Sequence, residues 1–307
     1  MTNPTTIAHL SDVHLGPIAG FAPRYWNVKR ALGYVNWLRT RRQAYQRPAL
    51  DLLLADLQAQ APDHIAITGD LVNIGLPQEH INALAWLESV GAPGRVSVIP
   101  GNHDIYSWLG RDPGSGRWAH YMAPDAAGSE HMDDSGEPFP FVRRLGPIAL
   151  IGVNSAVPTP PFVASGRLGR EQLARLAAIL DRLAGQDVFR LVLIHHPPLP
   201  GQAKRFRGLE DAEDARAVLE RHGAELVIHG HNHHSTLEWC ATGAGKVPVV
   251  GVPSASLGRP HRREPLARYN LFRIAGPPWS IELIGRGLER PGGEIVEIER
   301  QTLTLQA

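Results

Sequence analysis

The stretch Ile228-His229-Gly230-His231-Asn232-His233-His234 places four histidines within six residues. It follows the apolar residues Leu226 and Val227, and an apolar run that stops at glycine is typical of a buried strand giving way to a loop. Neutral imidazole nitrogens are good ligands for transition metals. The stretch therefore predicts a metal site at a strand end, although solvated loops also carry histidine clusters. Ligands from other strand ends would decide between these interpretations.

The composition is that of an ordinary globular protein. The 307 residues include 43% apolar and 20% charged side chains, and the formal net charge is +1, which gives no general reason to expect nucleic-acid binding. The single cysteine, Cys240, excludes an internal disulfide and fits a reducing compartment. Residues 1–6 lack the features of a signal peptide, and no apolar run is long enough to span a membrane. We therefore expect a cytoplasmic protein with one domain, residues 1–307.

Four other predicted strands also end in clusters of polar side chains. The clusters are Asp12-Val13-His14, Gly69-Asp70, Gly101-Asn102-His103-Asp104 and His195-His196-Pro197. The strands alternate with amphipathic helices, which predicts an α/β fold with the clusters gathered at one edge. Each cluster alone is weak evidence, because a turn aspartate or a structural histidine would look the same. Spacing does not say which of His195 and His196 would bind a metal. The ordered set of five clusters nevertheless strongly indicates one site.

Residues 17–50 are the least expected part of the chain, because they contain seven basic residues and no acidic one. Apolar residues recur there at helical spacing, namely Val28, Leu32, Val35 and Leu38. This pattern predicts a basic amphipathic helix beginning near Asn27, followed by a second helix over residues 51–60. The first helix would form a cap over the site or a surface that meets anionic lipid or a polyphosphate. The alternative is an ordinary helix packed on its own core.

The five clusters, in this order, resemble the motifs of the calcineurin-like metallophosphoesterase superfamily, and the resemblance covers roughly residues 5–235. The chain looks most similar to the bacterial branch that includes cyclic-nucleotide and glycerophosphodiester phosphodiesterases. The resemblance implies an α/β fold in which two mixed β-sheets pack as a sandwich flanked by helices, with a helical insert near residues 24–60. The basic, cap-like insert at about 17–50 departs from the family pattern and leaves the substrate open.

The resemblance also implies a pair of divalent metal ions, with Mn, Fe or Zn as the expected elements. One ion would be held by Asp12, His14, Asp70 and His233, and the other by Asp70, Asn102, His195 and His231. Asp70 would bridge the two. His195 is selected over its neighbour because the corresponding histidine of family members stands two places before a proline. Three remaining histidines would support or pack around the site: His196, His229 and His234.

Two cations about 3.5–4 Å apart can bind the attacking oxygen and the leaving oxygen of an in-line displacement at phosphorus. Water bound to the cations becomes a nucleophile near neutral pH. The resemblance implies that His103 protonates the leaving alkoxide, with Asp104 orienting its ring. We therefore expect a phosphodiesterase acting on a small phosphate ester. One alternative is a lipid-headgroup or pyrophosphate hydrolase, similar to UDP-diacylglucosamine pyrophosphatases, held at the inner face of the membrane by the basic helix. The other, a non-catalytic scaffold, is disfavoured because every expected ligand is present.

Overall fold

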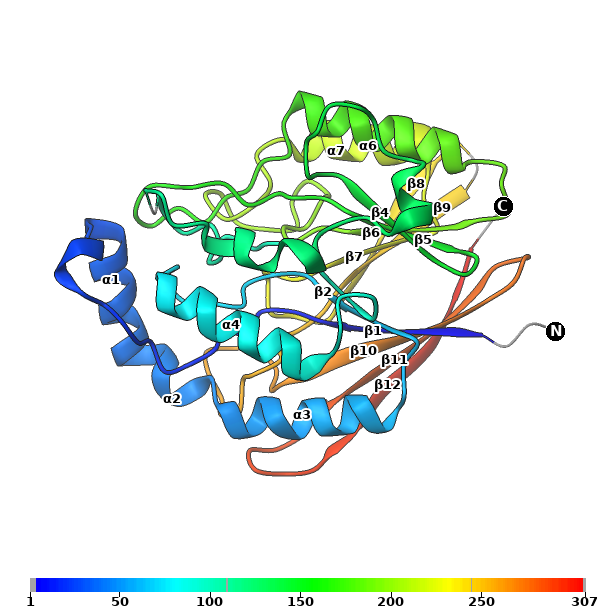
Figure 1. Ribbon diagram of the computed structural model, residues 1–307. Coiled ribbons are helices and arrows are strands. Elements are labelled where there is room, and N and C mark those ends of the chain that lie inside the picture. Colours follow the sequence, from blue (N-terminus) through cyan, green and yellow to red (C-terminus); the bar gives the residue numbers. More distant parts are fainter. Residues whose placement is uncertain (1–3, 109, 244, 306–307) are drawn as a thin grey trace.

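Two six-stranded sheets lie face to face in the computed structural model, which describes residues 4–108, 110–243 and 245–305 (Figure 1). The strands of the first sheet are β1 (Thr5–Leu10), β2 (His64–Ile67), β3 (Val96–Val98), β10 (Arg268–Ala275), β11 (Ser280–Leu288) and β12 (Ile295–Thr304). Their order is β12-β11-β10-β1-β2-β3. β1, β2 and β3 run parallel, whereas β10, β11 and β12 pair antiparallel.

The second sheet is also mixed. Its strands are β4 (Phe141–Leu145), β5 (Ile148–Gly152), β6 (Phe189–Leu193), β7 (Leu226–His229), β8 (Thr236–Thr242) and β9 (Gly245–Gly251), in the order β4-β5-β6-β7-β9-β8. The four inner strands are parallel, and β4 and β8 are antiparallel edges. The inner strands are almost continuously apolar because both faces of this sheet are covered. The predicted sandwich of two mixed sheets is therefore confirmed.

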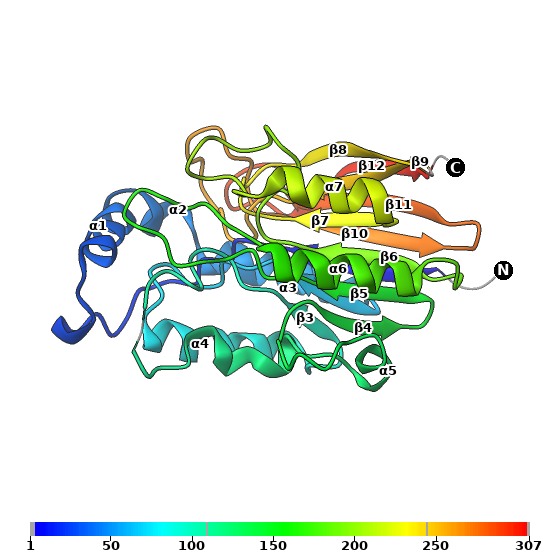
Figure 2. The same cartoon turned by 90° about the horizontal axis from the view of Figure 1, so that it is seen from above.

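Helices cover the outer faces of the sandwich (Figures 1 and 2). The helices α3 (Arg47–Ala59) and α4 (Pro77–Val90) pack with the first sheet, and α6 (Arg170–Leu183) and α7 (Ala212–His222) pack on the second. In α3 the buried side chains Leu50, Leu53 and Leu57 recur at helical spacing. α3 begins earlier than the expected residue 51, because Pro48 fits the first turn of a helix, where no intrahelical N–H donor is needed.

The basic insert forms a short helical cap at one end of the molecule (Figure 2). It consists of η1 (Pro23–Tyr25), α1 (Val28–Asn36), the π-helical turn η2 (Trp37–Arg41) and α2 (Arg42–Ala44). α1 begins where the sequence predicted, because the Asn27 side chain accepts a hydrogen bond from the Arg30 N–H at 2.8 Å. The guanidinium of Arg30 is buried and donates to the carbonyls of Ile74 and Gly75 at 3.3 and 3.2 Å. These bonds attach the cap to the loop after β2.

The apolar stripe of α1 does not pack on the core. Val28, Leu32 and Val35 of α1 are exposed, as is Leu38, which continues the stripe in η2. The side chains that the cap turns inward are Arg30, Trp37 and the small Ala44 instead. An ordinary amphipathic helix buries its apolar face, so the interpretation of this helix as one packed on its own core is wrong.

Two further differences concern local structure. The edge strand β8 was not expected, because exposed Glu238 and Trp239 stand next to each other in it and obscure the alternation of a half-buried strand. The segment 105–140 is not wholly irregular, because it contains η3 (Gly114–Tyr121) and α5 (Ala126–Ser129). Trp118 is fully buried and anchors η3. Among the described helices, none combines the length and apolar character that crossing a bilayer requires.

Candidate metal centre

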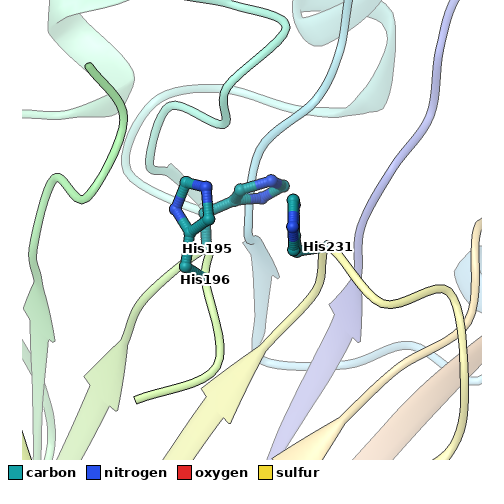
Figure 3. A group of neighbouring side chains, drawn as sticks. All are labelled: His195, His196 and His231. Carbon is teal, nitrogen blue, oxygen red and sulfur yellow. The ribbon is translucent and has the colours of Figure 1, made fainter. Parts of the chain in front are cut away.

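The seven predicted ligands lie on the loops that follow β1, β2, β3, β6 and β7, and all seven are buried. These strand ends meet because the strands run parallel within each sheet. Donor atoms of Asp12, His14 and His233 lie within 4.8 Å of one another, as do those of Asp12, Asp70 and His195. Figure 3 shows the rings of His195 and His231 reaching toward each other from the loops after β6 and β7. The structure therefore brings the predicted ligands together in one buried cluster.

The backbone at the ligands adopts conformations that L-residues usually avoid. Five predicted ligands have positive φ: Asp12 at 54°, His14 at 44°, Asp70 at 57°, His231 at 67° and His233 at 57°. Such conformations cost on the order of 1–3 kcal/mol each and persist only where surrounding contacts impose them. Backbone hydrogen bonds do so here, from Asp12 N–H to the Gly69 carbonyl at 3.0 Å and from His14 N–H to the Asp70 carbonyl at 2.9 Å.

Two motif glycines allow the loops to approach closely. A Cβ on Gly101 would collide with Oδ1 of Asp70 and lie 2.7 Å from Cε1 of His195. A Cβ on Gly230 would collide with the Ser11 hydroxyl and lie 2.6 Å from Oδ2 of Asp12. Real Cβ atoms do not approach other heavy atoms this closely, so a side chain at either position would push ligands apart.

The hydrogen-bond partners of His195 determine which of its nitrogens can bind a cation. Its Nδ1 lies 2.6 Å from the Thr68 carbonyl oxygen and therefore carries the proton. The lone pair is then on Nε2, which faces Oδ1 of Asn102 at 3.2 Å and Oδ1 of Asp70 at 3.5 Å. Nδ1 of His231 approaches the same Asn102 oxygen at 3.0 Å. Several acceptors that face one point are satisfied by a bound cation.

His14 completes a second group on the other side of Asp70. Its Nδ1 donates to the Val72 carbonyl at 3.1 Å, which leaves the lone pair on Nε2. That nitrogen has no hydrogen-bond partner among the described residues and lies 3.9 Å from Oδ2 of Asp70. The two carboxylate oxygens of Asp70 thus face two different sets of donors. An orphaned buried nitrogen beside a carboxylate fits metal ligation.

Electrostatics favour cation binding at these residues. Burial lowers the pKa of His14, His195 and His231, so these rings are neutral at pH 7, the form that binds metals. Burial and the neighbouring Asp12 carboxylate raise the pKa of Asp70 well above its usual value. A divalent cation between the two carboxylates would remove that repulsion.

His233 is oriented by a carboxylate that no sequence motif indicated. Glu264 Oε2 lies 2.9 Å from Nδ1 of His233, and the Tyr45 hydroxyl contacts both groups at 3.1 Å. Nε2 of the same ring faces Oδ1 of Asp12 at 3.1 Å. Burial favours the neutral ring, but the two carboxylates outweigh it and raise the pKa of His233 to about 9. A carboxylate behind a ligating histidine holds the ring in place and increases its basicity.

His103 lies at the same site, with its backbone N–H donating to Oδ1 of Asp70 at 2.7 Å. Its Nδ1 makes a short hydrogen bond to the Asn73 carbonyl, and its Nε2 accepts from Nη1 of Arg41 at 3.2 Å. The Asp104 carboxylate faces backbone amides and not the ring of His103. It accepts hydrogen bonds from Asp70 at 2.8 Å, Leu71 at 2.9 Å, Val72 at 3.1 Å and Gly101 at 2.8 Å. Asp104 therefore positions the loop that carries Asp70, and the contact that orients His103 comes from Asn73.

The three other histidines have partners away from the ligand set. His196 lies beside His195 and His231, but its ring nitrogens contact the Ser155 hydroxyl at 2.8 Å and the Ala164 carbonyl at 3.3 Å (Figure 3). His229 contacts the Gly230 carbonyl at 3.0 Å, and exposed His234 contacts the Asn232 carbonyl at 2.7 Å. Donor atoms of His195, His196 and His231 also lie within 4.8 Å of one another, so the placement of the three histidines outside the ligand set stays a prediction.

A cavity of about 380 Å³ opens above the predicted ligands. The cap contributes Lys29, Trp37 and Arg41 to its wall, and Phe162 and Arg207 lie on other segments around it. Sequence reasoning did not assign these residues to the site, nor Tyr45 and Glu264. The only available signal was the excess of basic residues in the insert. The cavity thus combines an acidic and imidazole-rich floor with a cationic wall.

Comparisons with known proteins agree with this geometry. Residues 5–235 match the family described as calcineurin-like phosphoesterase. A probable cyclic nucleotide phosphodiesterase of Synechococcus sp. is 28% identical over 218 residues, covering 68% of this chain and 71% of that protein. A glycerophosphodiester phosphodiesterase of Enterobacter lignolyticus is 29% identical over 192 residues, 58% of each chain. The chain therefore spans little more than half the length of the latter.

Solved structures share the fold at low sequence identity. A dimetal phosphatase from Danio rerio superposes with a TM-score of 0.62 at 15% identity, covering 97% of this chain and 99% of that one. A purple acid phosphatase from yellow lupin (Lupinus luteus) gives a TM-score of 0.60 at 13% identity, covering 100% of this chain and 55% of that one. Together with the family match over residues 5–235, these findings show that the chain belongs to the calcineurin-like phosphoesterase family, whose members are metal-dependent phosphoester hydrolases.

Proposed function

We propose that this protein is a phosphodiesterase that uses two divalent metal ions. The observation that carries the proposal is the position of Asp70. Its Oδ2 faces Nε2 of His14 at 3.9 Å, and its Oδ1 faces Nε2 of His195 at 3.5 Å. A carboxylate with one oxygen toward each of two donor groups is suited to bridge a pair of ions.

Each ion would have four protein ligands. The proposed sets are Asp12, His14, Asp70 and His233 for one ion, and Asp70, Asn102, His195 and His231 for the other. Such nitrogen and oxygen donors suit Mn, Fe or Zn. When bound, the ions supply Lewis acidity to the phosphate oxygens and a nucleophile derived from water. The neutral amide of Asn102 keeps the donor set less anionic than a carboxylate would, which favours the approach of a phosphate diester.

His103 is the proposed general acid. The short bond from its Nδ1 to the Asn73 carbonyl directs Nε2 toward the cavity and Arg41. Nε2 accepts from Arg41 in this arrangement, so the ring would first take up a proton there and then pass it to the leaving alkoxide oxygen of the substrate. Asp104 acts indirectly in this proposal, because its bonds to backbone amides hold the loop of Asp70, which in turn accepts from the His103 N–H.

Cations of the cavity wall favour an anionic substrate. Lys29 Nζ donates to the Thr159 hydroxyl at 2.7 Å and lies 4.4 Å from the centre of the Tyr106 ring. Among the described residues, neither Lys29 nor Arg41 has a carboxylate partner within ion-pair distance. Unpaired cations beside a phosphoester site suit the binding of phosphate oxygens.

The test is hydrolysis of bis-(p-nitrophenyl) phosphate by protein loaded separately with Mn²⁺, Fe²⁺ and Zn²⁺. We expect turnover that chelation abolishes and metal restores. A screen of cyclic nucleotides, glycerophosphodiesters and phosphate monoesters then identifies the preferred class. Exclusive turnover of monoesters would overturn the diesterase proposal, and full activity after exhaustive removal of metal would overturn the metal requirement.

A second candidate is a hydrolase of lipid headgroups or pyrophosphates that works at a membrane surface. The specific observation in its favour is the exposed apolar stripe of α1 beside the cavity, which includes Leu32 in the cavity wall. Adding nucleoside diphosphate-lipids to the substrate screen separates the two candidates. A preference for these lipids over soluble diesters would favour the second.

A further inference from the structure

Exposed apolar side chains gather around the mouth of the cavity. Besides the α1 stripe, Phe162 is 87% exposed, Trp108 81%, Trp26 63% and Phe206 58%. They come from four segments, here called the rim: residues 23–41, 105–108, 157–164 and 204–207. Elsewhere in the described part of the chain, the exposed large apolar side chains are Leu52, Ile81 and Trp239.

Hydrogen bonds show that the rim segments lie side by side. The Asn27 amide donates to the Ser107 hydroxyl at 3.1 Å, which joins the start of α1 to the residue before Trp108. Lys29 donates to Thr159 at 2.7 Å, which joins α1 to the segment of Phe162. The Ala164 N–H donates to the Phe206 carbonyl at 2.8 Å, which joins the last two segments. The four segments therefore lie together, and their exposed side chains form one surface. This surface includes α1, which projects at one end of the molecule (Figure 2).

The charge of this surface has one sign. The cap and its flanks, residues 17–50, carry seven basic residues and no acidic one, and residues 199–209 carry Lys204, Arg205 and Arg207 with no acidic one. Residues 157–167 also lack acidic side chains. The whole chain, by contrast, has 31 basic and 30 acidic residues. The rim is therefore positive, and the remainder of the protein carries the balancing negative charge.

We propose that the rim docks onto an anionic lipid bilayer, so that the metal centre faces a phosphoester presented at the membrane surface. This inference rests on the proposed function, because it uses the same cavity. Exposed Trp, Phe, Leu and Val next to Arg and Lys match an interfacial surface, which inserts apolar side chains while its cations meet lipid phosphates. Nucleic acid would account for the cations but not for the aliphatic stripe. Two copies of the rim would repel each other, because both are positive.

The experiment is co-sedimentation of the metal-loaded full chain with two kinds of vesicle, pure phosphatidylcholine and an equal mixture with phosphatidylglycerol. Binding to the anionic vesicles is expected, with little binding to the neutral ones and release at high salt. The apolar variant is V28S/W108S/F206S, in which none of the replaced residues lines the cavity. Its matched control, L52S/I81S/W239S, replaces exposed apolar side chains outside the rim. We expect roughly tenfold weaker binding for the rim variant and parent-like binding for the control.

A second pair of variants tests the charge. R24E/R39E reverses two exposed cap arginines, and R221E/R290E reverses two exposed arginines elsewhere. Only the cap pair should lose binding to anionic vesicles, by roughly tenfold or more. Both rim variants should keep parent turnover of soluble bis-(p-nitrophenyl) phosphate, which shows that they are folded.

The outcomes separate docking from catalysis. A parent protein that hydrolyses the soluble diester but ignores anionic vesicles overturns docking and leaves the proposed function standing. A parent that binds the vesicles but hydrolyses no phosphoester overturns the proposed function instead. Three other results would also overturn the docking proposal. The parent could bind neutral vesicles as well as anionic ones, the rim and control variants could lose vesicle binding equally, or the protein could dimerise through the rim.

Discussion

Nη1 of Arg41, from the cap, lies 3.2 Å from Nε2 of His103, at the end of the ring that faces the cavity. This contact brings the basic insert into the site that the strand-end motifs form. The π-helical turn η2 ends at Arg41 and leads the chain on to Tyr45, whose hydroxyl reaches His233 at 3.1 Å. The cap therefore contacts both the proposed general acid and a proposed metal ligand.

Replacing Arg41 by alanine should weaken substrate binding more than it slows turnover. A charge-assisted hydrogen bond to a phosphate oxygen contributes about 1.5–3 kcal/mol, so KM for a diester should rise roughly tenfold or more. Steady-state kinetics measure this, with Arg39→Ala as the control because Arg39 is exposed on the same turn. An unchanged KM would show that Arg41 does not meet the substrate.

The same variant should shift the pH profile. Burial, and after it the charge of Arg41, lowers the pKa of His103 well below its usual value. Removing that charge raises the pKa of His103, so the ring stays protonated to higher pH. The alkaline limb of the pH–rate profile should therefore move to higher pH. Profiles of Arg41→Ala and Arg41→Lys measure the effect. Lysine keeps the charge and should preserve the parent limb, and an identical shift in both variants would contradict this explanation.

Removing Asp70 and removing His103 should have different effects on metal content. Asp70→Ala should lose both ions, because this carboxylate faces both donor groups. His103→Ala should retain both ions, and its turnover rate should fall about 10²–10⁴-fold. Metal analysis of the purified variants tests this, with exposed Asp51→Ala as the control. Parent-like hydrolysis of a diester with a poor leaving group by the His103 variant would refute its assignment as the acid.

Glu264→Ala should weaken metal binding without removing a ligand. Glu264 holds Nδ1 of His233 at 2.9 Å, and loss of such a supporting carboxylate typically lowers metal affinity about 10–100-fold. Titration of the metal-free protein measures the affinity. Glu264→Gln keeps a hydrogen-bond acceptor and should lose less metal affinity than Glu264→Ala. The control Glu238→Ala, at an exposed position, should bind metal with the affinity of the parent. Equal affinity in all three variants would mean that the ring of His233 does not need this contact.

Acid should remove part of the stability that Asp56 provides. Burial opposes ionisation of this carboxyl, but hydrogen bonds from Arg286 and Tyr269, at 2.7 and 2.6 Å, lower the pKa of Asp56. A depressed carboxyl pKa stabilises the fold above the unfolded value of about 3.9, and this stability is lost as pH falls through the lower folded value. Urea unfolding across this range measures the loss.

Asp56→Asn should lack that acid-dependent loss and be less stable than the parent near pH 7. Asp51→Asn serves as the control, because its pair with Arg47 is about half exposed on both sides. If Asp56→Asn followed the parent at every pH, the ionised pair with Arg286 would contribute nothing to stability.

Much of the fold and of the candidate site was predictable from local patterns. Strand-end motifs at residues 12–14, 69–70, 101–104, 195–197 and 230–233 each follow an apolar run, and parallel strands bring such ends together. That physical rule predicted the pocket without any contact being known. It could not indicate Glu264, because a single carboxylate outside a strand-end motif has no pattern, and only the folded chain places it behind His233. The hydrogen-bond partners of Asp104 could not be predicted either, because every residue except proline has a backbone N–H and the sequence does not mark which ones a carboxylate will meet.

The sequence by itself determined the α/β class, the gathering of polar strand-end clusters at one edge and the existence of a basic amphipathic helix, because periodicity and composition encode these features. The choice of seven proposed metal ligands among those residues rests on the resemblance to the family. Only the tertiary structure decided the direction in which that helix faces. Spacing predicts that Val28, Leu32, Val35 and Leu38 share one face, but not whether the face meets the core or solvent. The buried guanidinium of Arg30, bonded to the carbonyls of Ile74 and Gly75, sets the rotation of α1 and leaves the apolar face outward.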